Sequence, residues 1–90
     1  MERTCTIECK EYIDRQNLEG LKELWAIYKE ADNAGRISWD VVFKDVYIHA
    51  CLKKRREFVT WLEEIYKEFD PISQIALKTV FPYGRHLLRK

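Results

Sequence analysis

The chain has 90 residues, 47% of them hydrophobic and 34% charged, which predicts one small folded domain spanning residues 1–90. Because 16 basic residues oppose 15 acidic ones, the net charge of +1 gives no overall field that would select nucleic acid or an anionic membrane. The longest runs without a charged residue span seven positions, too short for a membrane span of about 20, and no signal-peptide stretch is recognisable, so an intracellular protein is expected.

Two helices are expected in the first third of the chain. The first begins at a threonine cap, Thr4 or Thr6, and runs to about Arg15, before a short turn in the residues RQNLEG. The second has large apolar side chains at spacings of three and four, the pattern of one buried helical face. These side chains are Leu18, Leu21, Leu24, Trp25 and Tyr28. The second helix should end near Asn33 and Gly35, which suit a left-handed C-terminal cap.

The middle of the chain, residues 38–69, contains either two helices or one long helix. Ser38 suits an N-cap, and apolar stripes lie on both sides of the basic stretch 53–57. The first stripe comprises Val42, Phe43, Val46, Tyr47 and Ala50, and the second comprises Phe58, Val59, Trp61, Leu62, Ile65, Tyr66 and Phe69. A continuous helix of 32 residues would exceed the usual length in globular proteins, so a break is predicted at 53–57.

The last quarter of the chain is expected to be helical but interrupted. Asp70-Pro71 stops the preceding helix and opens a short one over Ile72–Val80, because proline is tolerated in a first helical turn. Pro82 and Gly84 then punctuate the chain, and residues 86–90 form a last helical turn or two. The whole chain is therefore predicted to be all-α, with five or six helices.

Two segments of the chain resemble one another. Residues 20–32 and 58–70 agree at six of thirteen positions when shifted by 38, and residues 41–47 show a weaker likeness to 75–81. Self-similarity at this period is typical of stacked helical pairs, because one pair cannot bury both of its faces. The predicted architecture is a short stack of antiparallel helical hairpins, with approximate units 4–33, 38–69 and a partial unit 71–90.

The segment 41–69 resembles the helical part of an ankyrin repeat. Ala50-Cys51 lies where the first helix of such a unit has its small residue, Lys54–Glu57 lies at the bend, and Val59 and Trp61-Leu62 lie on the second helix. The pattern is most similar to the divergent ankyrin-type repeats of large DNA viruses. The resemblance implies a scaffold that binds partners and carries no chemistry of its own. A plain array of five or six helices is the alternative.

Two basic clusters, at residues 53–56 and 85–90, allow two interpretations. They could contact a phosphate backbone if they lie on one face, or the first could be a solvated bend between helices. A binder of single strands would also need exposed aromatic side chains, and the aromatic residues near the clusters have the spacing of core positions. The bend is the favoured interpretation. The surface predicted to bind a partner comprises Trp39, Lys54, Arg55, Arg56, Tyr83 and Arg85.

Neither metal binding nor catalysis is indicated. The three cysteines, Cys5, Cys9 and Cys51, are an odd number without CxxC or HxxxH spacing, so buried thiols are expected, with no disulfide, metal or cofactor. Asp45 lies four residues before His49 and could contact it on a helix, but no nucleophile is placed beside the pair. The protein is expected not to be an enzyme.

The combined prediction is a module for protein–protein interaction whose partners are neighbouring subunits. One hypothesis is a minor structural, capsid-associated subunit of a large viral assembly, in the host cytoplasm or the virion. A host-directed adaptor would use the same surface. The alternative is a small helical protein that binds nucleic acid through clusters 53–56 and 85–90.

Overall fold

The residues that the structure describes form six helices. The computed structural model describes residues 2–32 and 34–89, and within these ranges the secondary structure is entirely helical. The helices are α1 (Glu2–Asp14), α2 (Leu18–Ala31), α3 (Trp39–Leu52), α4 (Arg56–Lys67), α5 (Pro71–Leu77) and α6 (Val80–Arg89). The prediction of an all-α fold is confirmed. None of these described helices has both the length and the apolar character that crossing a membrane requires.

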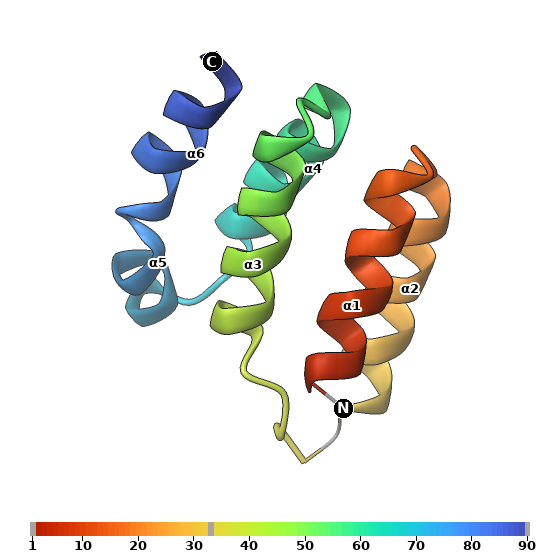
Figure 1. The fold of residues 1–90 in the computed structure, drawn as a ribbon. Helices are drawn as coiled ribbons and strands as arrows, with labels where there is room; N and C mark the ends of the chain where they lie inside the picture. The colour runs from red at the N-terminus through yellow and green to blue at the C-terminus, as the bar shows by residue number, and fades with distance from the viewer. Residues whose placement is uncertain (1, 33, 90) are drawn as a thin grey trace.

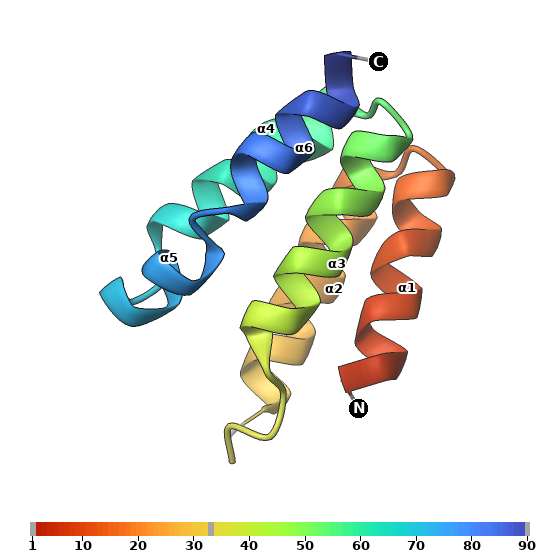
Figure 2. The same ribbon diagram turned by 60° about the vertical axis from the view of Figure 1, so that its left-hand side comes forward.

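The helices pack in two layers around α3. Helix α3 lies between α1 and α6 and also contacts α4 and α5, while α2 packs on α1 (Figure 1). After rotation, α2 is seen behind α3 and α4 behind α6 (Figure 2). The shortest extent of 19 Å fits two layers, because an α-helix with its side chains is about 10–12 Å across. The first four helices therefore form two antiparallel pairs, α1/α2 and α3/α4.

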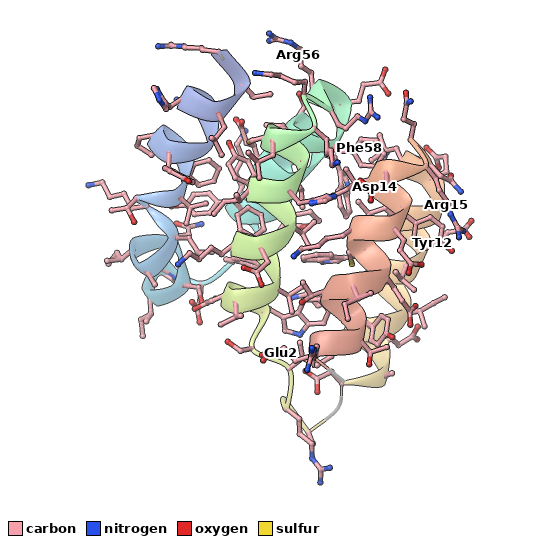
Figure 3. All side chains as sticks on the ribbon, viewed as in Figure 1. Glu2, Tyr12, Asp14, Arg15, Arg56 and Phe58 are labelled. Carbon is pink, nitrogen blue, oxygen red and sulfur yellow. The ribbon has the colours of Figure 1, made fainter. Side chains whose placement is uncertain are left out.

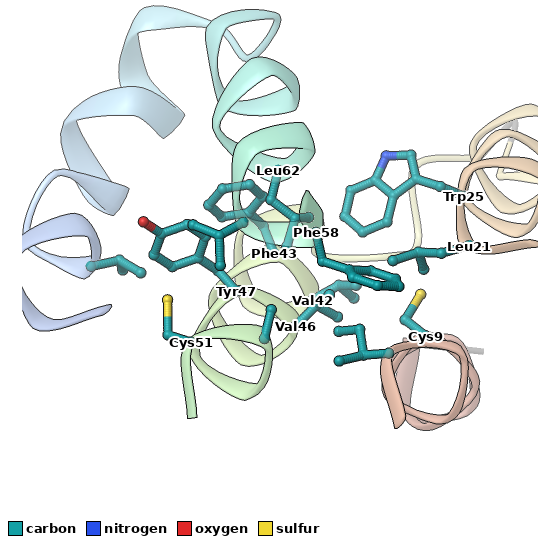
Figure 4. Packing of buried hydrophobic residues seen from close by; sticks show 14 of the residues in the cluster. Cys9, Leu21, Trp25, Val42, Phe43, Val46, Tyr47, Cys51, Phe58 and Leu62 are labelled. Atoms are coloured by element: carbon teal, nitrogen blue, oxygen red, sulfur yellow. The ribbon is translucent and has the colours of Figure 1, made fainter. Parts of the chain in front are cut away.

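The core is centred on α3, whose solvated side carries Val41, Lys44, Asp45 and Leu52. Six of its side chains are buried with 0% exposure, and they recur at spacings of three and four. They are Val42, Phe43, Val46, Tyr47, Ala50 and Cys51, all but Ala50 labelled in Figure 4. The rings of Phe43 and Tyr47 stack at 5.6 Å, and the ring of Phe81 from α6 meets that of Tyr47 edge-on at 5.0 Å. Burying these large apolar side chains contributes about 1.5–3 kcal/mol each.

The predicted break between α3 and α4 is confirmed and has a specific backbone cause. Lys54 adopts a left-handed conformation with φ of 61°, its N–H donates to the carbonyl of Cys51, and the N–H of Arg55 donates to that of Ala50. This Schellman arrangement satisfies carbonyls that the end of α3 would otherwise leave unpaired. The α1–α2 turn has the same form, with Gln16 in the left-handed position.

The boundaries at α1, α2 and α3 differ in detail from the predicted caps. Helix α1 begins at Glu2, so neither Thr4 nor Thr6 caps it; Thr6 lies within the helix and donates to the carbonyl of Glu2. Asn33 lies outside the described residues. Gly35 is left-handed as expected, with φ of 63°, but α2 has already ended at Ala31.

An aspartate rather than a glycine organises the loop that follows α2. The Asp32 carboxylate accepts from the N–H groups of Arg36 and Ile37 and from the indole of Trp39. Ser38 occupies the N-cap position of α3 as predicted, although within the described structure its hydroxyl makes no capping bond. One carboxylate at the end of α2 therefore binds two positions of the loop and the first residue of α3.

The C-terminal segment is more regular than the sequence predicts. Pro82 and Gly84 lie inside one continuous helix, α6, rather than interrupting it. Pro82 is the third residue of that helix, in the first turn, where a backbone N–H would have no helical partner. Gly84 is buried against Tyr47 and Cys51, so it allows the backbone of α6 to approach α3 closely.

We predict that Gly84→Ala destabilises the protein. An added Cβ would overlap the Tyr47 ring and lie 2.9 Å from the Cys51 sulfur, and both side chains are fully buried. Overpacking of this kind costs about 1–3 kcal/mol, whereas the same substitution at an open helical site stabilises by about 0.5–1 kcal/mol. The midpoint of urea unfolding measures the difference, and an unchanged or higher midpoint would refute the close approach. Pro82→Ala, in the same helix and exposed, provides the control.

Candidate functional site

The two basic clusters meet at one end of the molecule. The Lys54 ammonium donates to the carbonyl oxygens of Leu87 at 2.7 Å and of Leu88 at 3.1 Å, at the C-terminal end of α6. The figures agree: Arg56 and the end of α6 both lie at the upper end of the view (Figure 3). We define the basic end as residues 53–56 with the last turn of α6. The sequence alone could not place these two segments together, because they are more than thirty residues apart.

The cations of the two clusters have different surroundings. Lys54 caps the carbonyl end of α6, where a positive charge is favourable, and a guanidinium nitrogen of Arg85 lies 3.6 Å from a carboxylate oxygen of Glu63. The Nε of Arg55 is buried and has no hydrogen-bond partner among the described residues. Lys53 and Arg56 are exposed. So is Arg89, while Lys90 lies outside the described residues.

The six residues predicted to bind a partner do not form one continuous surface. Trp39 begins α3, whereas Lys54, Arg55 and Arg56 follow its end, so a helix of about 20 Å separates them. Tyr83 and Arg85 lie on α6, and Tyr83 is 55% exposed. The structure therefore brings Lys54–Arg56 close to α6 but leaves Trp39 at the opposite end.

Trp39 is half-buried and belongs to an aromatic cluster between α2, α3 and α4. Its ring lies 4.9 Å from that of Trp25, which in turn meets Trp61 edge-on at 5.7 Å. The Lys29 ammonium lies over the Trp39 ring at 4.6 Å and over Phe69 at 5.2 Å. These contacts are cation–π interactions, and burial lowers the pKa of Lys29. Most of the Trp39 ring is therefore engaged within the fold.

Helix α5 exposes an apolar face that sequence reasoning missed. Ile72 is 80% exposed and Ile75 is 74% exposed, and their spacing of three places them on one side of the helix. Leu77 is the buried residue of the same helix. A helix of seven residues can bury only one side, so the two β-branched side chains remain in solvent. The sequence did contain a signal for this face: PISQIAL has more apolar residues than one buried side of a short helix can hold.

Polar contacts hold α5 against the end of α4. The Gln74 side-chain amide donates to the carbonyls of Tyr66, Lys67 and Phe69, at 3.1–3.3 Å. The Tyr66 hydroxyl returns a 2.7 Å bond to the carbonyl of Gln74. Asp70 caps α5 by accepting from the N–H of Ser73 at 2.8 Å, at the position where the sequence predicted a new helix to begin. These bonds define the Gln74 clamp, which fixes how Ile72 and Ile75 are presented.

A shallow groove lies between α4 and α6. It is lined by Glu63, Tyr66, Lys67, Phe81 and Arg85. Its floor is aromatic, because the rings of Tyr66 and Phe81 meet edge-on at 4.4 Å, and its rim carries the Glu63–Arg85 ion pair. Arg85, which the sequence predicted to contact a partner, therefore borders a surface of mixed apolar and charged character.

His49 pairs with a residue of another helix and not with Asp45. Its Nε2 lies 2.8 Å from an Asp14 carboxylate oxygen at the end of α1. The hydrogen bond from His49, with the nearby charges of His49, Lys53 and Arg55, lowers the pKa of Asp14. The helical spacing of Asp45 and His49 was a local signal, and the tertiary packing of α1 on α3 overrides it. The pair links two helices.

All three thiols are buried in the core. Cys5, Cys9 and Cys51 are free and fully buried, as predicted. Burial raises the pKa of Cys51 to about 11, and a hydrogen bond with Cys5 together with burial raises that of Cys9. In the ranges 2–32 and 34–89, no three potential metal ligands converge.

Comparison of the chain with known protein families, curated proteins and solved structures finds no match.

We predict that Lys54→Met destabilises the protein by about 1 kcal/mol, since it removes a charged donor from the carbonyl end of α6. Lys53→Met is the matched control, because Lys53 precedes it in the same turn and is exposed. Urea unfolding midpoints of the two variants check the prediction. Equal midpoints for the two variants would show that the Lys54 contact contributes nothing.

We predict that Asp14→Asn destabilises the protein more at pH 6 than at pH 2.5. The folded-state pKa of Asp14 is lowered, so its stabilising effect is present above the ordinary carboxyl pKa and is lost as the pH falls through the lowered value. Thermal melts of the wild-type and variant proteins at both pH values measure the difference. Asp45→Asn, on the exposed side of α3, serves as the control. A difference that is constant with pH would contradict the assignment.

Proposed function

We propose that the protein is a non-enzymatic module for protein–protein interaction and acts as a subunit of a larger assembly. The observation that carries this proposal is the pair of isoleucines that a rigidly held α5 exposes to solvent. Burying each of them against a partner would contribute about 1.5–3 kcal/mol. Loss of translational and rotational freedom costs at least about 4 kcal/mol, so the partner must cover more than these two side chains.

The groove between α4 and α6 supplies the remaining contact area. A specific interface buries about 800 Å² on each side, a modest fraction of the 5909 Å² of this molecule. An interface of that size would extend from α5 over Tyr66, Phe81 and the exposed Tyr83. We propose a partner that presents apolar side chains to Ile72 and Ile75 and polar groups to the Glu63–Arg85 pair. Aromatic and arginine side chains are enriched at such contacts.

Internal symmetry supports a repeat architecture, which would make the module one element of a stack. The left-handed residues Gln16 and Lys54 lie 38 positions apart, the same shift as the sequence self-similarity. Buried residues of α1 and α3 correspond at this shift as well. The pairs are Cys5 with Phe43, Cys9 with Tyr47 and Ile13 with Cys51.

We propose two helical-pair units, 4–33 and 38–69, and a partial unit, 71–90. Ends of such arrays gain stability when a neighbour covers them. The ankyrin-type likeness of 41–69 favours a structural subunit of a large viral assembly.

We predict that a photoreactive p-benzoylphenylalanine at position 72 forms a discrete covalent adduct with a protein partner in the native host cell. Ile75→Ser in the same chain should abolish the adduct, because it removes the adjacent apolar contact without disturbing the core. The probe placed at Ile27 is the matched control, since this isoleucine is 62% exposed on α2. Mass spectrometry of the adduct identifies the partner.

Two results would contradict the proposal. One is adducts of the same kind and yield from positions 72 and 27, which would indicate random collision. The other is an adduct at position 72 that survives Ile75→Ser, which would show that the apolar face does not determine binding. The Ile72→Ser/Ile75→Ser protein should keep its unfolding midpoint, because both side chains are largely in solvent.

A further inference from the structure

We propose that the basic end binds the phosphate backbone of duplex nucleic acid without reading its sequence. This inference is independent of the proposed protein partner. The basic end lies where α3 ends and α4 begins, and α5 lies at the other end of the same helices (Figures 1 and 2).

The first step of the argument is the convergence of cations from two distant segments. The contact of Lys54 with the carbonyls of Leu87 and Leu88 holds the 53–56 turn beside the last turn of α6. The same contact neutralises the negative carbonyl end of that helix. Three further cations are exposed around this helix end: Lys53, Arg56 and Arg89. Because Lys54 already offsets the negative potential of the carbonyls, these three charges remain available to an anion.

The second step is the charge balance of the basic end. Arg15, in the α1–α2 turn, is also exposed at this end of the molecule (Figure 3). Two carboxylates lie at or beside this end: Asp14, which is paired with His49, and Glu57, which follows Arg56 in the sequence. In the described part of the chain, no ion pair involves Lys53, Arg56 or Arg89, so positive charge predominates although the net charge of the protein is only +1.

The third step is the choice of ligand. A single strand would need aromatic rings on which bases stack, but Phe58, the aromatic residue of the α4 first turn, is only 3% exposed. Peripheral membrane binding combines cations with a broad apolar face, whereas the large apolar side chain exposed next to residues 53–56 is Leu52 alone among the described residues of α3 and α4 that adjoin them. The regular phosphates of a duplex require only spaced cations, which this end provides.

The experiment is a fluorescence anisotropy titration of the full chain with a labelled duplex of 20 base pairs. Three to four phosphate contacts predict that affinity falls by about 40- to 150-fold between 50 and 200 mM salt, and that unrelated sequences bind equally. Arg56→Gln/Arg89→Gln should reduce the slope of log affinity against log salt by about two and the affinity at 50 mM by roughly tenfold or more.

The matched control is Lys44→Gln/Lys78→Gln, which removes the same charge from exposed positions away from the basic end. Circular dichroism establishes that both double variants are folded. The proposal is overturned if the two variants lose affinity equally, if no binding occurs at 50 mM salt, or if vesicles rich in phosphatidylserine bind more tightly than the duplex. Loss of duplex binding would leave the α5 crosslink unaffected, so the two proposals fail separately.

Discussion

Burial of α3 on several sides is the constraint on which the remaining structure depends. Its side chains at 0% exposure must be covered by α1, α4 and α6 together, because no single neighbour can cover a helix that is apolar over most of its circumference. The stacked rings of Phe43 and Tyr47 fill the space toward α6, and Gly84 lets the backbone of α6 approach them. The C-terminal helix α6 is thus needed to cover the core.

Much of the fold was predictable because it follows from local patterns. Apolar spacing identified α2 and α4, and Asp70-Pro71 identified the start of α5. The continuity of α6 was not predictable, because proline and glycine ordinarily interrupt a helix. The helix tolerates Pro82 because this residue lies in the first turn, and Gly84 is favoured there because it packs against Tyr47. Local periodicity could not reveal that His49 meets Asp14 instead of Asp45.

The candidate surfaces were predictable in their residues but not in their grouping. The sequence identified the cluster Lys54–Arg56. Only the tertiary structure shows that Lys54 binds the carbonyl end of α6 and that Arg85 faces Glu63. Exposure also divides the aromatic residues: Tyr83 faces solvent while Trp39 is largely enclosed by Trp25 and Lys29. A pattern of residue types indicates which chemistry is present, and packing decides which of it is accessible.

The Gln74 clamp has a consequence for how readily α5 can recognise anything. A seven-residue helix would fray if it stood alone, and a fraying segment must lose backbone freedom on association. Here the amide of Gln74 and the hydroxyl of Tyr66 have already immobilised that backbone in the unbound protein. The entropic cost of ordering α5 is thus incurred during folding. A partner that binds α5 loses little affinity to ordering of its backbone.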